Sequence, residues 1–173
     1  MDYFVMTQDQ RLYSAAKLLP GPLNLPALTR AQLSAINSTM TLYVKADQNN
    51  QYPDYLEKPV GLVSEKLRGV MSKYQPDIRF KTVVLIEKER RRQELYYLII
   101  PPIIKGLWLS EPKPGHELAL DVEQAGEAGI FWDDSFAKRL IVRLDVAESI
   151  LRRNSYGVTF EKVSTGTKGG QPK

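Results

Sequence analysis

The clearest pattern of hydrophobic and polar positions lies near the C-terminus, in residues 140–163. Residues 140–142 form an apolar run with β-branched side chains, which predicts a buried strand. Apolar residues then recur at helical spacing, with Asp145 in the position of an N-cap and Glu148 three residues after it. After Gly157 the residues alternate between apolar and polar, as in a strand with one buried face. The segment therefore predicts a strand, a capped helix and a second strand.

The same order of elements is predicted a second time, in residues 59–86. A short apolar run at 60–63 is followed by Ser64 as an N-cap, a helix, and a strand at 78–86. Aligned with residues 140–163, the two copies lie about 80 positions apart and share few identities. Duplication and independent use of a common supersecondary unit are equally compatible with this pattern. The sequence therefore predicts two strand–helix–strand modules.

A strongly charged segment, residues 87–94, separates the strand-like runs at 78–86 and 95–100. This order is typical of an antiparallel hairpin with a solvated tip. Consecutive arginines from Arg90 to Arg92 lie in the tip and are flanked by glutamates. One interpretation is a charged run that is simply solvated. The other is an electrostatic anchor, because guanidinium groups bind carboxylates and phosphates through paired hydrogen bonds.

Further strands are predicted at 1–6 and 40–45, and all the predicted helices are short. Strands therefore outnumber helices, which favours an α+β fold with a mostly antiparallel sheet. We expect a single domain over residues 1–163. Residues 164–173 contain no apolar side chain, so we expect them to form a disordered C-terminal tail.

Composition narrows the classes of function. The chain has 173 residues, one histidine and no cysteine. The absence of cysteine excludes disulfides and cysteine-based metal centres, and it is compatible with a reducing cytoplasm. The histidine, His116, follows a Pro-Gly turn and is expected to be a solvated loop residue, although a serine hydrolase would have to use it as its base. Since no phosphate-binding or calcium-loop motif is present either, we expect no catalytic residue, metal site or cofactor.

The charge balance is mildly basic, with a formal net charge of +4. A basic balance suits an acidic protein, an anionic membrane surface or a nucleic acid. The glutamates beside the arginine run weaken its field, which argues against nucleic-acid binding. No apolar run approaches the ~20 residues that span a bilayer, and no signal-peptide pattern is present. We expect a soluble, cytoplasmic protein that binds neither a membrane nor a small-molecule substrate.

Two groups of side chains are candidates for contact with a partner. Tyr52 and Tyr55 lie in a polar, loop-like segment, where aromatic residues either anchor an interface or fold back over the sheet. Trp132 falls in a strand-like run and is expected in the core. Asp133 and Asp134 follow it, and neighbouring residues of an extended chain point to opposite faces. We therefore expect this acidic pair to form a polar turn or part of an interface rather than a metal site.

Several stretches resemble a family of presumed bacterial immunity proteins. They are the opening MDYFVMTQD, PVGLVSEKLRGVMSKYQPDIRFKTVVLIEK at 59–88, LYYLIIPPI at 95–103, and VRLDVAESILRR at 142–153 followed by GVTFEKV. The family is immunity family eleven, which is placed with polymorphic toxin systems, and the resemblance covers most of residues 1–163. It implies a protein that neutralises a toxin by binding it, and it carries over no catalytic residue. The chain departs from the family after Phe131, where a basic or aliphatic residue is expected; this difference either marks partner specificity or has no function.

The sequence thus predicts a non-enzymatic immunity protein that binds and neutralises a cognate secreted toxin domain. The candidate contact residues are Tyr52, Tyr55, Arg90, Arg91, Arg92, Trp132, Asp133 and Asp134. The alternative is a nucleic-acid-associated accessory protein that uses the basic hairpin tip. The salt dependence of binding distinguishes these two hypotheses, because binding to nucleic acid weakens steeply as the salt concentration rises.

Overall fold

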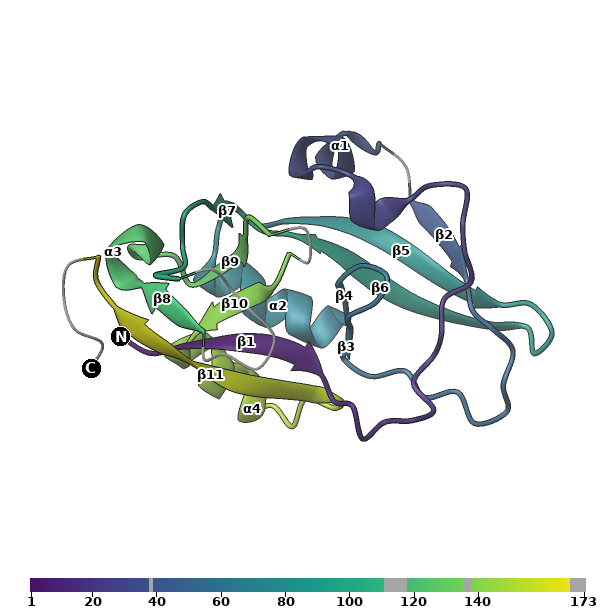
Figure 1. Ribbon diagram of the computed structural model, residues 1–173. Helices are drawn as coiled ribbons and strands as arrows, with labels where there is room; N and C mark the ends of the chain where they lie inside the picture. The colour runs from purple at the N-terminus through teal and green to yellow at the C-terminus, as the bar shows by residue number, and fades with distance from the viewer. Residues whose placement is uncertain (38, 111–117, 136–137, 169–173) are drawn as a thin grey trace.

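The computed structural model describes residues 1–37, 39–110, 118–135 and 138–168. Its strands form two mixed, mostly antiparallel sheets (Figure 1), which confirms the predicted α+β class. The six-stranded sheet has the order β7 (Ile103–Ile104), β9 (Ile130–Asp133), β10 (Leu140–Arg143), β1 (Tyr3–Gln8), β11 (Val158–Gly166) and β8 (Ala119–Asp121). The five-stranded sheet has the order β2 (Met40–Tyr43), β5 (Arg79–Glu87), β6 (Arg92–Ile100), β4 (Leu62–Val63) and β3 (Tyr55–Leu56). The helices are α1 (Arg30–Ala35), α2 (Glu65–Tyr74), α3 (Val122–Ala125) and α4 (Leu144–Leu151), and residues Leu25–Ala27 form a 3-10 turn.

The two sheets contain the same arrangement of five strands. The order β3-β4-β6-β5-β2 in one sheet corresponds to β9-β10-β1-β11-β8 in the other. In both, the last pair is parallel and the other neighbours are antiparallel. The two strands of each predicted module therefore lie on either side of one antiparallel strand, which is β6 in the first module and β1 in the second. Both strand–helix–strand modules are confirmed, and each is split by a strand from elsewhere in the chain.

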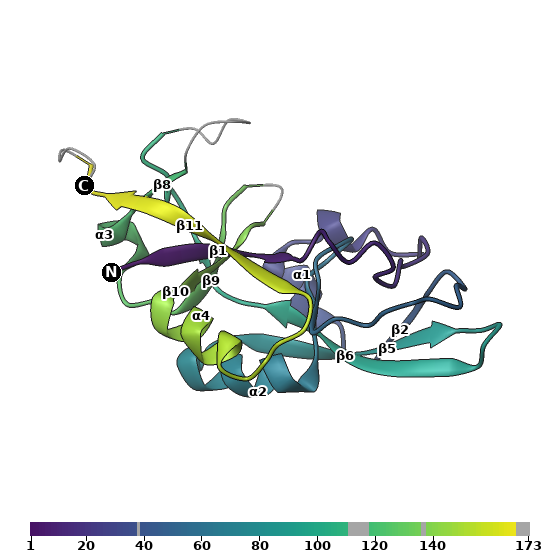
Figure 2. The same cartoon turned by 90° about the horizontal axis from the view of Figure 1, so that it is seen from below.

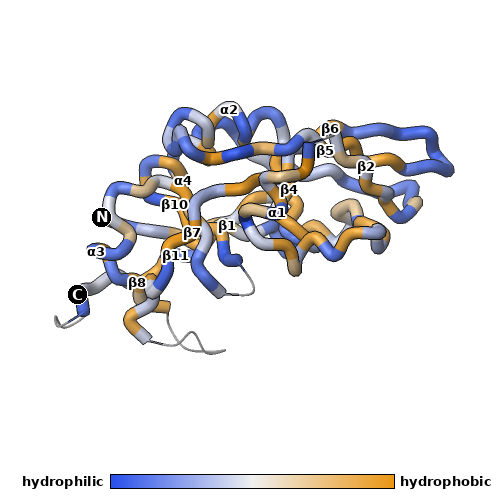
Figure 3. The backbone as a smooth tube through the Cα atoms, turned by 90° about the horizontal axis from the view of Figure 1, so that it is seen from above, coloured by the Kyte–Doolittle hydropathy of each residue, from blue (hydrophilic) through white to orange (hydrophobic). Residues whose placement is uncertain are grey.

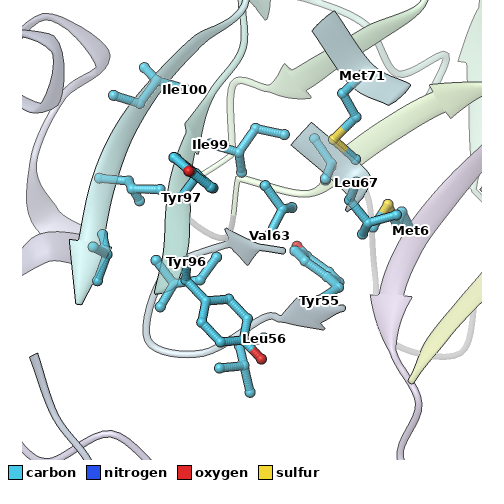
Figure 4. Packing of buried hydrophobic residues seen from close by; sticks show 14 of the residues in the cluster. Met6, Tyr55, Leu56, Val63, Leu67, Met71, Tyr96, Tyr97, Ile99 and Ile100 are labelled. Carbon is cyan, nitrogen blue, oxygen red and sulfur yellow. The ribbon is translucent and has the colours of Figure 1, made fainter. Parts of the chain in front are cut away.

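The module helices occupy equivalent places on their sheets. Helix α2 contacts β4 and β6, helix α4 contacts β10 and β1, and the two helices pack against each other (Figure 2). Their buried faces belong to one core cluster that also takes side chains from strands of both sheets. Figure 4 shows part of this cluster, with Met6 of β1 beside Leu67 of α2 and Tyr55 of β3. A shared core of this kind fixes the two sheets relative to each other.

One local prediction is corrected at the second module. Helix α4 begins at Leu144 with Arg143 as its N-cap residue, so the predicted N-cap at Asp145 is wrong. The carboxylate of Asp145 instead accepts hydrogen bonds from Nε and Nη2 of Arg143, at 2.8 and 2.7 Å. Asp145 still lies in the first turn, where a negative charge is favourable beside the helix dipole. The N-cap at Ser64 is confirmed, since its side chain accepts a hydrogen bond from the backbone of Leu67.

The predicted start of the C-terminal tail is also too early. Strand β11 continues to Gly166, because residues 164–166 pair with β8 through their backbone. Backbone pairing needs no apolar side chain, so composition alone did not reveal it. Residues 169–173 lie outside the described residues. Among the helices that the structure describes, none is long and apolar enough to cross a membrane.

Candidate binding surfaces

The tip of the β5–β6 hairpin is held to a neighbouring loop by a buried carboxylate. Only 1% of Glu87 is exposed, and its side chain accepts hydrogen bonds from the hydroxyl of Tyr52 at 3.1 Å and the backbone amide of Asp47 at 3.2 Å. Nε of Arg90 lies 3.7 Å from the same carboxylate. The guanidinium of Arg92 stacks over the ring of Tyr52, 4.2 Å from its centroid. Glu87 therefore assembles Tyr52 and the hairpin arginines into one surface, which we call the hairpin platform.

The hairpin platform contains Tyr52, Arg90, Arg91 and Arg92, all of which the sequence proposed as contact residues. The tip projects beyond the rest of the sheet in Figure 1 and has hydrophilic colours in Figure 3. Much of its positive charge is paired internally, because Arg90 faces Glu87 and Nε of Arg92 lies 2.8 Å from Glu94. The platform is therefore an exposed surface with less free charge than the arginine run indicates.

The charge of Glu87 is favoured by its neighbours. Burial opposes the charged form, but hydrogen bonds from Asn50, Tyr52 and the amide of Asp47, together with the charge of Arg90, hold the pKa of Glu87 below its usual value. For Tyr52, burial and the hydrogen bond to Glu87 raise the pKa to about 12, so its hydroxyl stays protonated as the donor. The carboxylate thus stabilises the folded state above the ordinary glutamate pKa, and this contribution is lost as pH falls through the lower, folded-state pKa.

Replacing Glu87 with glutamine is expected to lower the unfolding temperature at neutral pH, because the buried amide cannot accept from all of these donors. The difference from the unchanged protein should shrink as pH falls below the ordinary range of glutamate, where the carboxylate also loses its charge. Thermal unfolding followed by circular dichroism over a pH series measures both effects. Glu89→Gln, at an exposed position in the same tip, is the control and should change little. A Glu87→Gln difference that is constant with pH would contradict the role of its charge.

Tyr55 does not lie in an exposed loop. It forms strand β3, pairs with Val63 of β4 and is 4% exposed, so the prediction of a loop-presented aromatic is wrong at this position. The signal was missed because β3 has only two residues, too few to show the alternation of a strand. Figure 4 shows the ring among buried core side chains.

The segment from Trp132 to Asp134 lies in the other sheet and does not join the hairpin platform. Trp132 is 5% exposed, which confirms it as a core residue. Asp133 is completely buried and accepts hydrogen bonds from Trp108, Ser135 and both the backbone and the side chain of Arg139. Asp134 is exposed and accepts one hydrogen bond, from the amide of Gly106. The acidic pair is therefore split between the interior and the surface.

A large apolar groove was not proposed from the sequence. It has a volume of about 1060 Å³ and is lined by residues between 8 and 26, by residues between 36 and 42, and by Lys58 and Pro59. We call it the proline groove, because Pro20, Pro22 and Pro26 also lie in its wall. Among the described residues that line it, the charged ones are Lys17 and Lys58, and none is an aspartate or a glutamate. Figure 3 shows much of the segment between β1 and α1, which forms most of the groove wall, in hydrophobic colours.

The proline groove runs along the outer edge of β2. The amide of Leu19 donates to the carbonyl of Tyr43 at 2.8 Å, and the amide of Lys45 donates to the carbonyl of Lys17 at 2.9 Å. The chain then turns away at Pro20, which has no amide hydrogen to continue the ladder. By strand alternation the backbone groups of Thr41, a groove residue, also face away from β5. A partner strand is therefore able to pair beside Thr41.

One sequence feature does mark the groove. No acidic residue occurs between Asp9 and Asp47, although this stretch contains Arg11, Lys17, Arg30 and Lys45 among many apolar residues.

A smaller hollow adjoins the groove, and Pro26 and Pro59 line both. This inner cavity has a volume of about 290 Å³ and is lined by strands of both sheets and by α1. Its apolar wall includes Met6, Leu33, Leu98, Trp132 and Leu140, and its polar wall includes Tyr55, Glu57, Lys138 and Arg139. Tyr55 thus faces a cavity from within the core.

The described residues contain no group of three or more His, Cys, Asp or Glu side chains that could hold a metal ion. His116 lies outside the described residues. No model of a protein family matches the chain, and no curated protein matches it.

Proposed function

We propose that this protein is a non-enzymatic binding protein whose proline groove receives an extended segment of another protein. The observation that carries the proposal is the groove itself, which joins an apolar, acid-free wall to a part of the β2 edge that has no strand partner among the described residues. An extended peptide gains main-chain hydrogen bonds at such an edge and places alternate side chains in the neighbouring pockets. Together these features suit a peptide segment of a partner.

The chemistry of the groove specifies the partner segment. Lys17 and Lys58 are exposed in its wall without a lining carboxylate, so a segment that combines apolar and acidic residues is complementary. Complementary charge speeds encounter and disfavours basic partners. In line with the resemblance to immunity family eleven, the proposed partner is a cognate secreted toxin domain with an acidic binding face. The proposed place of binding is the cytoplasm.

The alternative, nucleic-acid binding through the hairpin tip, has less support. Arg90 and Arg92 each face a glutamate, which leaves little unpaired charge for a phosphate backbone. A steep loss of binding to DNA or RNA with rising salt would favour this alternative.

Reversing the charge of the groove is expected to weaken toxin binding at least about tenfold, because carboxylates then face the acidic segment. The variant is Lys17→Glu with Lys58→Glu. Isothermal calorimetry measures its binding to the purified candidate toxin domain, taken from the product of the neighbouring gene. The matched control, Lys73→Glu with Lys105→Glu, reverses two exposed lysines outside the groove and should bind nearly as the unchanged protein does. If both double variants weaken binding equally, the groove is not the binding site. No complex at micromolar concentrations would contradict the toxin pairing.

A further inference from the structure

The hydroxyl of Tyr55 lacks a hydrogen-bond partner among the described residues, although only 4% of the residue is exposed. A buried hydroxyl without a partner is costly, so it needs either a partner or an open space beside it. Among the described residues, the side-chain polar atom that is both fully enclosed and without a hydrogen-bond partner is Oγ of Ser34. The Tyr55 hydroxyl has no partner either, so it is not fully enclosed. A Cβ added at Gly61, another wall residue, would lie 3.4 Å from this hydroxyl. The Tyr55 hydroxyl therefore opens into the inner cavity.

The cavity holds a second donor. Nζ of Lys138 donates to the backbone carbonyls of Pro26, at 3.2 Å, and Leu28. An ammonium group has three protons, so these two bonds leave one; Nζ also lies 5.5 Å from the centroid of the Trp132 ring. Burial lowers the pKa of Lys138 and, with the nearby charge of Glu57, raises the pKa of Tyr55, so the phenol keeps its proton. The polar wall is thus able to donate to an oxygen atom of a bound group.

Besides the polar side chains, which include Glu57, Arg139 and Glu161, the wall contains apolar residues and an aromatic ring. Trp132 is 5% exposed and lines the cavity with Leu33 and Leu98. A volume of about 290 Å³ lies at the lower end of small-ligand pockets, so it suits one ring rather than an extended molecule. Pro26 and Pro59 line both the inner cavity and the proline groove, so the cavity lies next to the place proposed for the partner segment.

We propose that the inner cavity is an anchor pocket for a tyrosine side chain of the partner segment, with its phenolic oxygen hydrogen-bonded to Tyr55. The identity of the partner rests on the proposed function, but the pocket itself does not. A central aromatic anchor surrounded by weaker contacts is how many protein interfaces concentrate their binding energy. The phenol of the guest supplies the partner that the Tyr55 hydroxyl lacks.

The pocket is tested with p-cresol, which is the tyrosine side chain alone, and with toluene, which has the same ring and no hydroxyl. Each is titrated into the full chain while the indole N–H resonance of Trp132 is followed by NMR. Trp108 does not line the cavity and serves as the internal reference. We expect p-cresol to shift the Trp132 resonance and to bind at least fivefold more tightly than toluene.

Tyr55→Phe is the matched variant, because it removes only the unpartnered hydroxyl and should fold with an unfolding temperature equal to or above that of the unchanged protein. In this variant p-cresol should lose its advantage over toluene. Equal affinities for the two probes in the unchanged protein would overturn the role of Tyr55, and no shift with either probe would overturn the pocket. If the probes bind while the toxin domain does not, the pocket stands and the proposed partner fails.

Discussion

Replacing Asp133 with alanine is expected to lower the free energy of unfolding by about 3–5 kcal/mol, the range found when one partner of a buried ion pair is removed. The carboxylate is completely buried and lies 2.9 Å from Nη1 of Arg139. It also accepts hydrogen bonds from Nε1 of Trp108 at 3.1 Å and Oγ of Ser135 at 2.8 Å. Alanine removes the completely buried acceptor that these partly exposed donors share.

Urea unfolding measures this cost as a shift of the midpoint at constant slope. Asp134→Ala is the matched control, because the neighbouring carboxylate is exposed and its removal should change the free energy by less than about 0.5 kcal/mol. Asp133→Asn keeps one acceptor oxygen and should fall between the two. If Asp133→Ala has the same urea midpoint as the control, Arg139 and Trp108 bind water or other partners without a loss of free energy of unfolding.

The contrast between Asp133 and Asp134 shows what the sequence was able to predict here. Alternation along a strand correctly placed the two carboxylates on different faces. It did not reveal which face is buried, because the partners of Asp133 include Trp108 from a distant segment. Element type followed from local patterns, as at the capped helix α2 and the β5–β6 hairpin. Burial of individual polar residues depended on tertiary contacts.

The candidate surfaces divide in the same way. The hairpin arginines were found because a charged run between two strands is a local signal. The role of Glu87 could not be predicted from the sequence, because its partners Tyr52 and Asp47 come from another loop. The proline groove and the inner cavity form where residues far apart in sequence meet, so no local pattern marked their shape. The absence of acidic residues between Asp9 and Asp47 is visible in the sequence, but it does not show that this stretch lines a groove.

The N-terminal strand is the element whose position the sequence left most open. Strand β1 lies in the six-stranded sheet between β10 and β11, in the place that β6 takes in the other sheet. Strand β6 follows β5 through a short turn, whereas β1 arrives from the opposite end of the chain. Tyr3 pairs with Val163, so β1 begins beside the end of β11. Strands β11 and β1 therefore pair as β5 and β6 do in their hairpin, but without a direct turn from β11 to β1.

Deleting residues 1–8 is expected to abolish cooperative folding, because β10 and β11 lose the strand that joins them and the core loses Tyr3 and Met6. The loss should equal most of the stability of an ordinary domain, about 5–15 kcal/mol. Moving residues 1–10 to follow Lys173 should restore folding, since the order β10–α4–β11–β1 then copies β4–α2–β5–β6. Circular dichroism and urea unfolding of the deleted and permuted chains, with the moved residues scrambled as a control, measure the outcome. If the permuted chain is as unfolded as the deleted chain, the natural connection from β1 to the proline groove is required for folding. The same strand arrangement in the two sheets would then not be sufficient for folding.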